Sequence, residues 1–324
     1  MKRNIKKFLF PAVAVAVLSF AACSDWTETE SLDINYPTLE EQNPELYKQY
    51  LKALRDYKAG EHKVVLVSMD NTTSAPAQRN EHLTTMPDSV DIICLMNPDN
   101  LHPTLAGEFA KVREKGTRVI YNIDYNAIEK LWEKVLADEE ANKPEEPTNP
   151  STPEATQDEG GEGGGEGEPT PEEELELRFL EFCRQQTVSQ LNLCAKYGYD
   201  GVQVNYTGRA PQAMQEEEKA QYAARQEAFF SNVKTWNEAN SGKVLVFQGN
   251  PQNLIDKSVL GECDYIVIPA LTATSADKMS FAVLMAAVED VPTDRFVIGV
   301  TTPSLTDLSD ESGCLLYTSD AADE

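Results

Sequence analysis

Three polar side chains stand at alternate positions in the middle of the chain. Gln203, Asn205 and Thr207 are separated by single residues, in and just after a short segment that predicts a β-strand over 201–206. Because successive side chains of a strand point to opposite faces, all three point the same way. Amides and hydroxyls donate and accept hydrogen bonds, but neither is a general acid near neutral pH. The spacing therefore places three hydrogen-bonding side chains, none of them an acid, on one face of the expected strand.

Polar side chains also stand where the other expected strands end. Amides and carboxylates beside aromatic rings are typical of carbohydrate sites, where planar donor–acceptor groups bind hydroxyls and rings cover sugar faces. Asn and Asp also favour strand-to-helix turns, so a capping role is the alternative for each. Asp70 and Asp124 form a candidate carboxylate pair whose separation the sequence does not set. The further candidate ligand residues are Asp70, Asn97, Asn122, Asp124, Tyr206 and Gln248.

The elements that must position these side chains alternate along the chain. Short, nearly continuous apolar runs are expected of parallel strands buried on both faces, and helical patterns separate them. Strands are expected over 64–69, 90–96, 118–123, 201–206, 244–248, 265–269 and 296–300. Helices are expected over 40–57, 103–115, 175–197, 215–239, 253–259 and 275–289. The order predicts an α/β fold, a (β/α)8 TIM barrel truncated after about seven strands, with an open doubly wound sheet as the alternative.

Motifs for cofactors are missing from the sequence. No G-x-G-x-x-G follows the first expected strand and no phosphate-binding loop is present, so a nucleotide cofactor is not expected. The cysteines show no C-x-x-C spacing and no histidine pair nearby, so no metal site is expected. Four of them lie in apolar or helical segments and are predicted to be buried free thiols, namely Cys94, Cys183, Cys194 and Cys263.

The fourth expected strand carries a resemblance to a known family. Residues 200–207 read Asp-Gly-Val-Gln-Val-Asn-Tyr-Thr and resemble the signature Asp-Gly-x-Asp-x-Asp-x-Glu of glycoside hydrolase family 18. The resemblance extends over the strands from 64 to 300. Within the family, the sequence resembles the lipoprotein branch in Bacteroidetes, which includes surface endo-β-N-acetylglucosaminidases. In that family the final Glu is the general acid, and the Asp two residues before it assists the substrate N-acetyl group that acts as nucleophile. The resemblance implies a barrel and a glycan ligand.

The departures fall on the working positions of that signature. Gln203, Asn205 and Thr207 replace its three inward carboxylates, and only Asp200 and Gly201 match. Shape and hydrogen bonding are kept while charge is lost, so we expect a non-catalytic glycan-binding protein for N-acetylglucosamine-containing glycans. The alternatives are an active endo-β-N-acetylglucosaminidase or chitinase-like enzyme with a non-standard acid such as Asp124, a structural or adhesive surface protein, or a barrel strand unrelated to the family.

The first residues predict export. Residues 1–22 combine a basic start with an apolar stretch too short to span a membrane, followed by small residues, which is typical of a signal peptide. The segment before Cys23 resembles the lipobox of bacterial lipoproteins, and the acidic residues after it resemble a surface-export signal. We expect Cys23 to carry lipid, 23–38 to form a leader, and the protein to lie on the outer membrane; an ordinary signal peptide with an incidental cysteine is the alternative.

Composition bounds the remaining segments. Residues 138–174 hold 14 acidic residues and one lysine, too polar to fold alone, and predict a disordered insertion within a barrel at 39–313; an acidic ligand trap is the alternative. Residues 314–324 resemble a translated sequencing adapter, with a genuine tail as the alternative.

The net charge of −26 argues against nucleic acid and against direct adhesion to anionic lipid as partners. The expected partners are a glycan, the outer membrane through the lipid, and glycan-uptake machinery.

Overall fold

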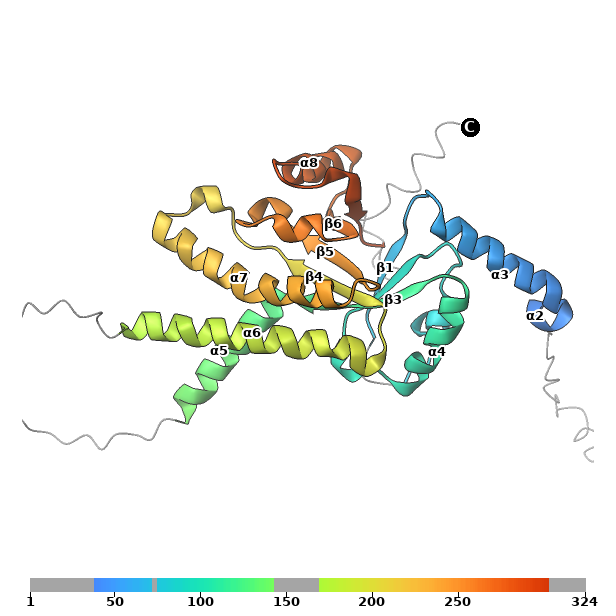
Figure 1. Cartoon of the computed structure of the whole chain (residues 1–324), viewed down its shortest axis with the longest axis horizontal. Helices are drawn as coiled ribbons and strands as arrows, with labels where there is room; N and C mark the ends of the chain where they lie inside the picture. Colours follow the sequence, from blue (N-terminus) through green and yellow to red (C-terminus); the bar gives the residue numbers. More distant parts are fainter. Residues whose placement is uncertain (1–37, 72–74, 143–168, 303–324) are drawn as a thin grey trace, which may run out of the picture. The chain divides into compact units, whose positions relative to one another are not determined.

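The computed structural model describes residues 38–71, 75–142 and 169–302 (Figure 1). The signal peptide, Cys23 with its leader, the centre of the acidic insertion and the segment 314–324 lie outside these residues, so the expectations for them stay predictions. The chain divides after Tyr50 into two compact units. The expected helix at 40–57 is two helices, α2 (Leu39–Gln42) and α3 (Pro44–Ala59). Pro44 lacks a backbone N–H and so begins a new helix.

The second unit contains one parallel sheet with its strands in sequence order. Its strands are β1 (Leu66–Met69), β2 (Ile92–Leu95), β3 (Arg118–Asp124), β4 (Gly201–Tyr206), β5 (Val244–Gly249), β6 (Tyr265–Pro269) and β7 (Phe296–Gly299). Each strand pairs with the next one along the chain, from β1 to β7. Within the described part of the chain, β1 and β7 do not pair with each other. This confirms the expected α/β fold, with seven parallel strands of a (β/α) barrel in the described part of the chain.

In the described part of the chain, five α-helices lie in the connections between these strands. They are α4 (Pro103–Glu114), α5 (Tyr125–Ala141), α6 (Pro171–Tyr197), α7 (Glu216–Ala239) and α8 (Ala276–Ala286). Helices α6 and α7 pack side by side, as Figure 1 shows. The sequence did not predict α5, and the expected helix at 253–259 is wrong, because 3-10 turns at Pro251–Asn253 and Ser258–Gly261 take its place. No helix of the described residues is both long and apolar enough to cross a membrane.

The expected insertion at 138–174 is too wide at both ends. Helix α5 continues to Ala141, and α6 begins at Pro171. At that start the Thr170 hydroxyl accepts a hydrogen bond from the Glu173 N–H at 3.3 Å, and the Glu173 carboxylate accepts one from the Thr170 N–H at 2.7 Å. This reciprocal capping box begins a helix inside an acidic stretch. Residues 143–168 lie outside the described part.

Two apolar clusters show which way the strand side chains point. The inner cluster fills the concave side of the sheet and includes Cys94, Ile120, Val244, Val246 and Val267. The outer cluster lies between the sheet and the helices and includes Val202 and Val204 of β4. The alternation expected for β4 is confirmed, because Gln203 and Asn205 must then face the inner side. The four cysteines expected to be free thiols are buried and unbridged.

Candidate functional site

A row of polar side chains crosses three neighbouring strands near their carboxyl ends. Asp124 of β3 pairs in register with Asn205 of β4, and Asn205 pairs with Gln248 of β5. Residues in register on adjacent strands share a face of the sheet, and Asn205 is on the inner face. We call this end of the inner face the mouth. The sequence-based candidates Asp124, Asn205 and Gln248 are therefore brought together.

Gln203 lies two residues before Asn205 on the same face of β4, and its side chain bonds to residues of β3 and β5. Its side chain is fully buried, and its Nε2 donates to Asn122 Oδ1 at 3.1 Å and to Gln248 Oε1 at 2.8 Å. Its Oε1 is buried and has no hydrogen-bond partner among the described residues. An unpartnered buried acceptor has a cost of roughly 1–3 kcal/mol, unless water or a ligand donates to it. The network can therefore accept one further donor.

Thr207 follows β4 and is half-buried at the same mouth. Its hydroxyl accepts a hydrogen bond from Asn126 Nδ2 at 3.2 Å, and its carbonyl accepts from Asn250 Nδ2 at 3.0 Å and Asn253 Nδ2 at 2.8 Å. Three amides from two other segments thus fix the end of β4. The position is rigidly held but supplies no titratable group near neutral pH.

The two candidate carboxylates, Asp70 and Asp124, make hydrogen bonds to neighbouring residues. Asp124 caps α5, because its Oδ1 accepts from the Asn126 N–H at 3.0 Å. Burial raises the pKa of Asp124, and the capping hydrogen bond acts in the opposite direction. Asp70 is exposed, and Asn97 Nδ2 donates to its Oδ1 at 2.6 Å. Among the described residues Asp70 and Asp124 share no hydrogen bond, so nothing supports the carboxylate pair.

The candidate Tyr206 does not face the mouth. It is 1% exposed, packs against Tyr125 and Phe230, and its hydroxyl accepts from Gln226 Nε2 at 2.8 Å. The expectation that Tyr206 contacts a ligand is therefore wrong. The same alternation that turns Asn205 inward turns Tyr206 outward, into the layer beneath α7.

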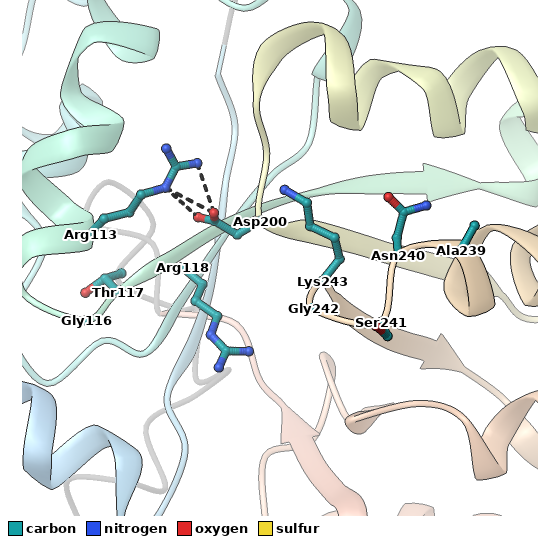
Figure 2. A pocket seen from close by; sticks show the side chains of 10 residues that line it. All are labelled: Arg113, Gly116, Thr117, Arg118, Asp200, Ala239, Asn240, Ser241, Gly242 and Lys243. Carbon is teal, nitrogen blue, oxygen red and sulfur yellow. Dashed lines mark hydrogen bonds and ion pairs between the residues drawn. The ribbon is translucent and has the colours of Figure 1, made fainter.

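Asp200, which matches the family signature, lies at the opposite end of β4. Its carboxylate accepts from the Val119 N–H at 2.9 Å and pairs with Arg113, as Figure 2 shows. A cavity of about 580 Å³ lies here. Its cations do not converge: Lys243 donates to the Tyr199 carbonyl, while Arg118 points the other way (Figure 2). We therefore do not place the functional site at this cavity.

Asp200 is one of three aspartates with the same structural role at the amino ends of the strands. Asp91 accepts the Val65 N–H at 2.8 Å, and Asp264 accepts the Leu245 N–H at 2.9 Å. Asp91, Asp200 and Asp264 directly precede β2, β4 and β6. Each carboxylate accepts a backbone N–H at the start of the neighbouring strand, which is β1, β3 or β5. Asp200 therefore has a structural role, and its match to the signature is no evidence of catalysis.

A second cavity, of about 410 Å³, adjoins the mouth beside β2 and β3. The candidates Asn97, Asn122 and Asp124 line it, whereas Gln203, Asn205, Thr207, Gln248 and Asp70 do not. It also includes residues that the sequence did not predict, notably Asp99, Gln186 and Gln190. The two glutamines are one helical turn apart on α6, and nothing in the sequence shows that this part of α6 faces the strand ends.

Comparison with known proteins settles the family. The sequence matches glycoside hydrolase family 18, BT1044-like, over residues 27–158 and 172–301. The chain belongs to glycoside hydrolase family 18. This confirms the resemblance of the fourth strand to the family signature, and it makes the replacement of three signature carboxylates in 203–207 a departure within the family. No curated protein sequence matches the chain.

Solved structures of family 18 and other hydrolases are similar to the chain at low identity. A BT1044 variant is 17% identical over 82% of this chain and 74% of its own, with a TM-score of 0.49. A family 18 chitinase from Pseudoalteromonas aurantia is 10% identical over 78% and 84%, with a TM-score of 0.43. The glycoside hydrolase domain of PelA from Pseudomonas aeruginosa is 13% identical over 77% and 98%, with a TM-score of 0.36. No conclusion about the site rests on these similarities.

Proposed function

We propose that the chain binds glycans containing N-acetylglucosamine and does not cleave them. The observation that carries this proposal is the polar group at the mouth, with amides at 203 and 205 and a hydroxyl at 207 where the family signature has carboxylates. Amides can donate to and accept from sugar hydroxyls and acetamido groups. Without the carboxylates, binding is retained while the proton transfer needed for hydrolysis is lost.

The amide network beneath the mouth supports a ligand that brings hydrogen-bond donors. Gln203 is buried among the amides of Asn122 and Gln248, and among the described residues its Oε1 has no donor. A buried amide network without formal charge favours a ligand that brings N–H or O–H groups, because a buried charge would need a partner of opposite sign. Sugar hydroxyls and acetamido N–H groups meet that requirement.

Calorimetry with N-acetylglucosamine oligosaccharides tests this function. Gln203→Leu and Asn205→Leu should each weaken binding by roughly fivefold to hundredfold, since a lost hydrogen-bond partner has a cost of about 1–3 kcal/mol. Val204→Ala is the matched control on the other face of β4, and should lower stability without changing affinity. If both leucine variants bind as well as the parent, the ligand does not sit at the mouth.

A second candidate is hydrolysis with Asp124 as the acid. Asp124 stands in register with Asn205, and burial raises the pKa of its carboxyl, which favours the protonated form that a general acid requires. Its capping bond to α5 opposes this role, because that bond stabilises the ionised form. Non-catalytic binding therefore remains the leading proposal.

The location we propose for this function is the outer surface of the outer membrane. It rests on the signal-like residues 1–22 and on Cys23 as the lipid attachment site, and glycan-uptake machinery is the partner class that this location suggests. Labelling of cells with a lipid analogue tests it. The parent chain should take up label and Cys23→Ser should not; equal labelling of both would contradict the anchor.

A further inference from the structure

Helix α8 carries an apolar face that no other described element covers. Its large side chains there are Phe281, Leu284 and Met285, and Val288 follows just after the helix; we call these four residues the α8 patch. They are 63%, 72%, 50% and 39% exposed, in that order. Spacing of three and four residues places side chains on one face of a helix. The α8 patch is therefore a continuous apolar stripe that meets solvent in a single copy of the chain.

The other face of α8 holds the helix in the fold. Ala286 is buried, and Ala282 packs against the outer cluster. Helix α8 contacts β6 and the 3-10 turn at Pro251–Asn253, and Figure 1 shows it on the outside of β6. The face that packs within the chain thus includes small side chains, whereas the largest apolar side chains of α8 are left in solvent.

The charges of α8 do not shield this stripe. Asp277 and Lys278 are the only charged residues of the helix, and both lie in its first turn. By contrast, the exposed face of α6 carries charged residues in the middle of the helix, for example Glu181 and Arg184. A surface helix normally turns its charged residues to water and its apolar residues to the core. The outer face of α8 therefore has the composition of a buried face.

The exposed area fits a small, specific contact. If a fully exposed large side chain presents about 150–250 Å², the α8 patch exposes roughly 400 Å². Apolar patches of about 300–600 Å² on a single chain are often functional. Two copies that cover each other's α8 patch remove about 800 Å² of apolar surface, and the charged margins bring the total to roughly 1,000–1,200 Å², the range of weak reversible interfaces.

The charges at the two ends of the α8 patch favour a second copy as the partner. Lys278 lies at the start of the stripe, and Glu289 and Asp290 directly follow its end. Lys278 Nζ donates to the Thr274 hydroxyl at 3.1 Å, and among the described residues neither Lys278 nor Glu289 forms an ion pair. Two antiparallel copies of α8 bring Lys278 of each beside Glu289 of the other. A lipid surface fits less well, because acidic residues outnumber the lysine at these margins.

We propose that two copies of this chain associate through the α8 patch, with the two α8 helices antiparallel about a two-fold axis. Such an interface is isologous, so both copies use the same residues. Phe281 and Leu284 lie at its centre, and Lys278 pairs with Glu289 of the other copy at both ends. The inference goes beyond the proposed function and does not depend on the glycan. A contact of this size gives a dissociation constant of about 1–100 µM.

Sedimentation velocity of the full chain tests the association. Cys23→Ser serves as the parent, because it removes the proposed lipid site and so excludes association through lipid. This parent should change from monomer to dimer between about 1 and 200 µM. Leu284→Lys should raise the dissociation constant at least about tenfold, because it places a charge at the centre of the interface. Leu177→Lys is the matched control, since Leu177 is a leucine of α6 that is 58% exposed, and it should leave the constant unchanged. Neither variant should lower the melting temperature, because both side chains are exposed.

Charge reversal tests the antiparallel arrangement. Lys278→Glu places two acidic groups at each end of the interface and Glu289→Lys places two cations there, so each variant alone should self-associate about twofold to tenfold more weakly. An equimolar mixture of the two variants should associate more tightly than either alone. In the mixed pair, the two substituted residues face each other with opposite charge at one end, and Lys278 faces Glu289 at the other. A lipid surface or an unrelated partner protein would not produce that recovery.

Each outcome decides the inference. A parent that stays monomeric at the highest concentration overturns it, and the α8 patch is then covered by a lipid surface or by another segment of the chain. An unchanged dimer in Leu284→Lys, or equal weakening in Leu284→Lys and Leu177→Lys, places the interface elsewhere and overturns it as well. If the mixture of charge variants associates no better than each variant alone, the antiparallel pairing is wrong and the inference falls.

Discussion

The side-chain amide of Asn126 donates a hydrogen bond of 3.2 Å to the hydroxyl of Thr207, and so ties the first turn of α5 to the end of β4. Thr207 stands where the family signature has its general acid. In this chain the position joins two segments of the mouth, and its hydroxyl stays protonated throughout the physiological pH range. The end of β4 therefore presents hydrogen-bonding groups at the mouth, and position 207 itself carries no titratable proton.

The first prediction concerns turnover. The purified chain should release no product from N-glycans or chitin oligosaccharides, because a general acid contributes roughly 10²–10⁴-fold to the rate and Thr207 cannot replace it. Mass spectrometry of the reaction mixture measures this. Asp124→Asn is the informative variant, with the exposed Asp256→Asn as its matched control. Turnover that survives in the control but disappears in Asp124→Asn would establish hydrolysis instead.

A second prediction separates structural from ligand roles at the two ends of β4. Asp200→Ala should destabilise the fold by about 1–3 kcal/mol, because it leaves the Val119 N–H without its acceptor and Arg113 without its ion pair. Urea unfolding measures the loss, and glycan affinity should not change while the protein is folded.

The matched control for Asp200 is another aspartate in an ion pair. Asp56 pairs with Lys52 on the exposed surface of α3, and Asp56→Ala should change stability by less than about 1 kcal/mol. Weakened glycan binding in folded Asp200→Ala would return Asp200 to the ligand site.

A third prediction is a pH dependence of stability set by His62. Its Nδ1 lies 2.9 Å from the Gly60 carbonyl oxygen and its Nε2 lies 2.9 Å from Asp91 Oδ1, so both ring nitrogens face acceptors. Only the protonated ring can donate to both. The hydrogen bond to Gly60, followed by that to Asp91, raises the pKa of His62 above its usual 6.5.

The sign of this effect follows from linkage. A pKa raised on folding gives stabilisation that is complete below about 6.5 and is lost as the pH rises through the higher pKa of the folded state. The urea midpoint should therefore fall as the pH rises from about 6 to 8, and His62→Gln should remove that part of the dependence. An unchanged pH profile in the variant would contradict this role.

The fourth prediction concerns the close contact between β4 and β5. A Cβ atom on Gly201 would lie 2.1 Å from the Val244 carbonyl oxygen, which is backbone and cannot move aside without shifting a strand. Gly201→Ala should therefore destabilise the fold by about 1–3 kcal/mol or more. Gly242→Ala is the control, since a Cβ there meets no atom within 4 Å, and it should stay within about 0.5 kcal/mol. Equal melting temperatures of Gly201→Ala and Gly242→Ala would contradict a close approach of Gly201 to the Val244 backbone.

The sequence predicted the strands better than the connections. Strands β4 and β6 begin and end at the expected residues. Strand β6 is a short apolar run, and β4 alternates apolar and amide side chains between polar flanking residues. Helix α5 was missed, because Glu and Lys dominate its surface and it continues directly into the acidic insertion. At 253–259 the apolar spacing fitted a helix, but the backbone turns twice in 3-10 form instead.

For the site, the sequence predicted positions but not contacts. Period-two alternation placed Gln203 and Asn205 on the inner face, and the same rule should have excluded Tyr206, which instead bonds to Gln226 under α7. The bond between Gln203 and Gln248 depends on the register of β4 against β5, which a single sequence does not reveal. The position of Gln186 beside the strand ends depends on how α6 packs against the sheet, which the sequence alone does not show either.

The three aspartates at the amino ends of the strands also bear on the order of folding. The links of Asp91 to Val65 and Asp264 to Leu245 span 26 and 19 residues, whereas that of Asp200 to Val119 spans 81, with the acidic insertion between them. Closing the longest loop has an additional entropic cost of about 1 kcal/mol relative to the 26-residue loop. We therefore expect β1–β2 and β5–β6 to form as early local units, and the joining of β3 to β4, which assembles the mouth, to be the late and rate-limiting event.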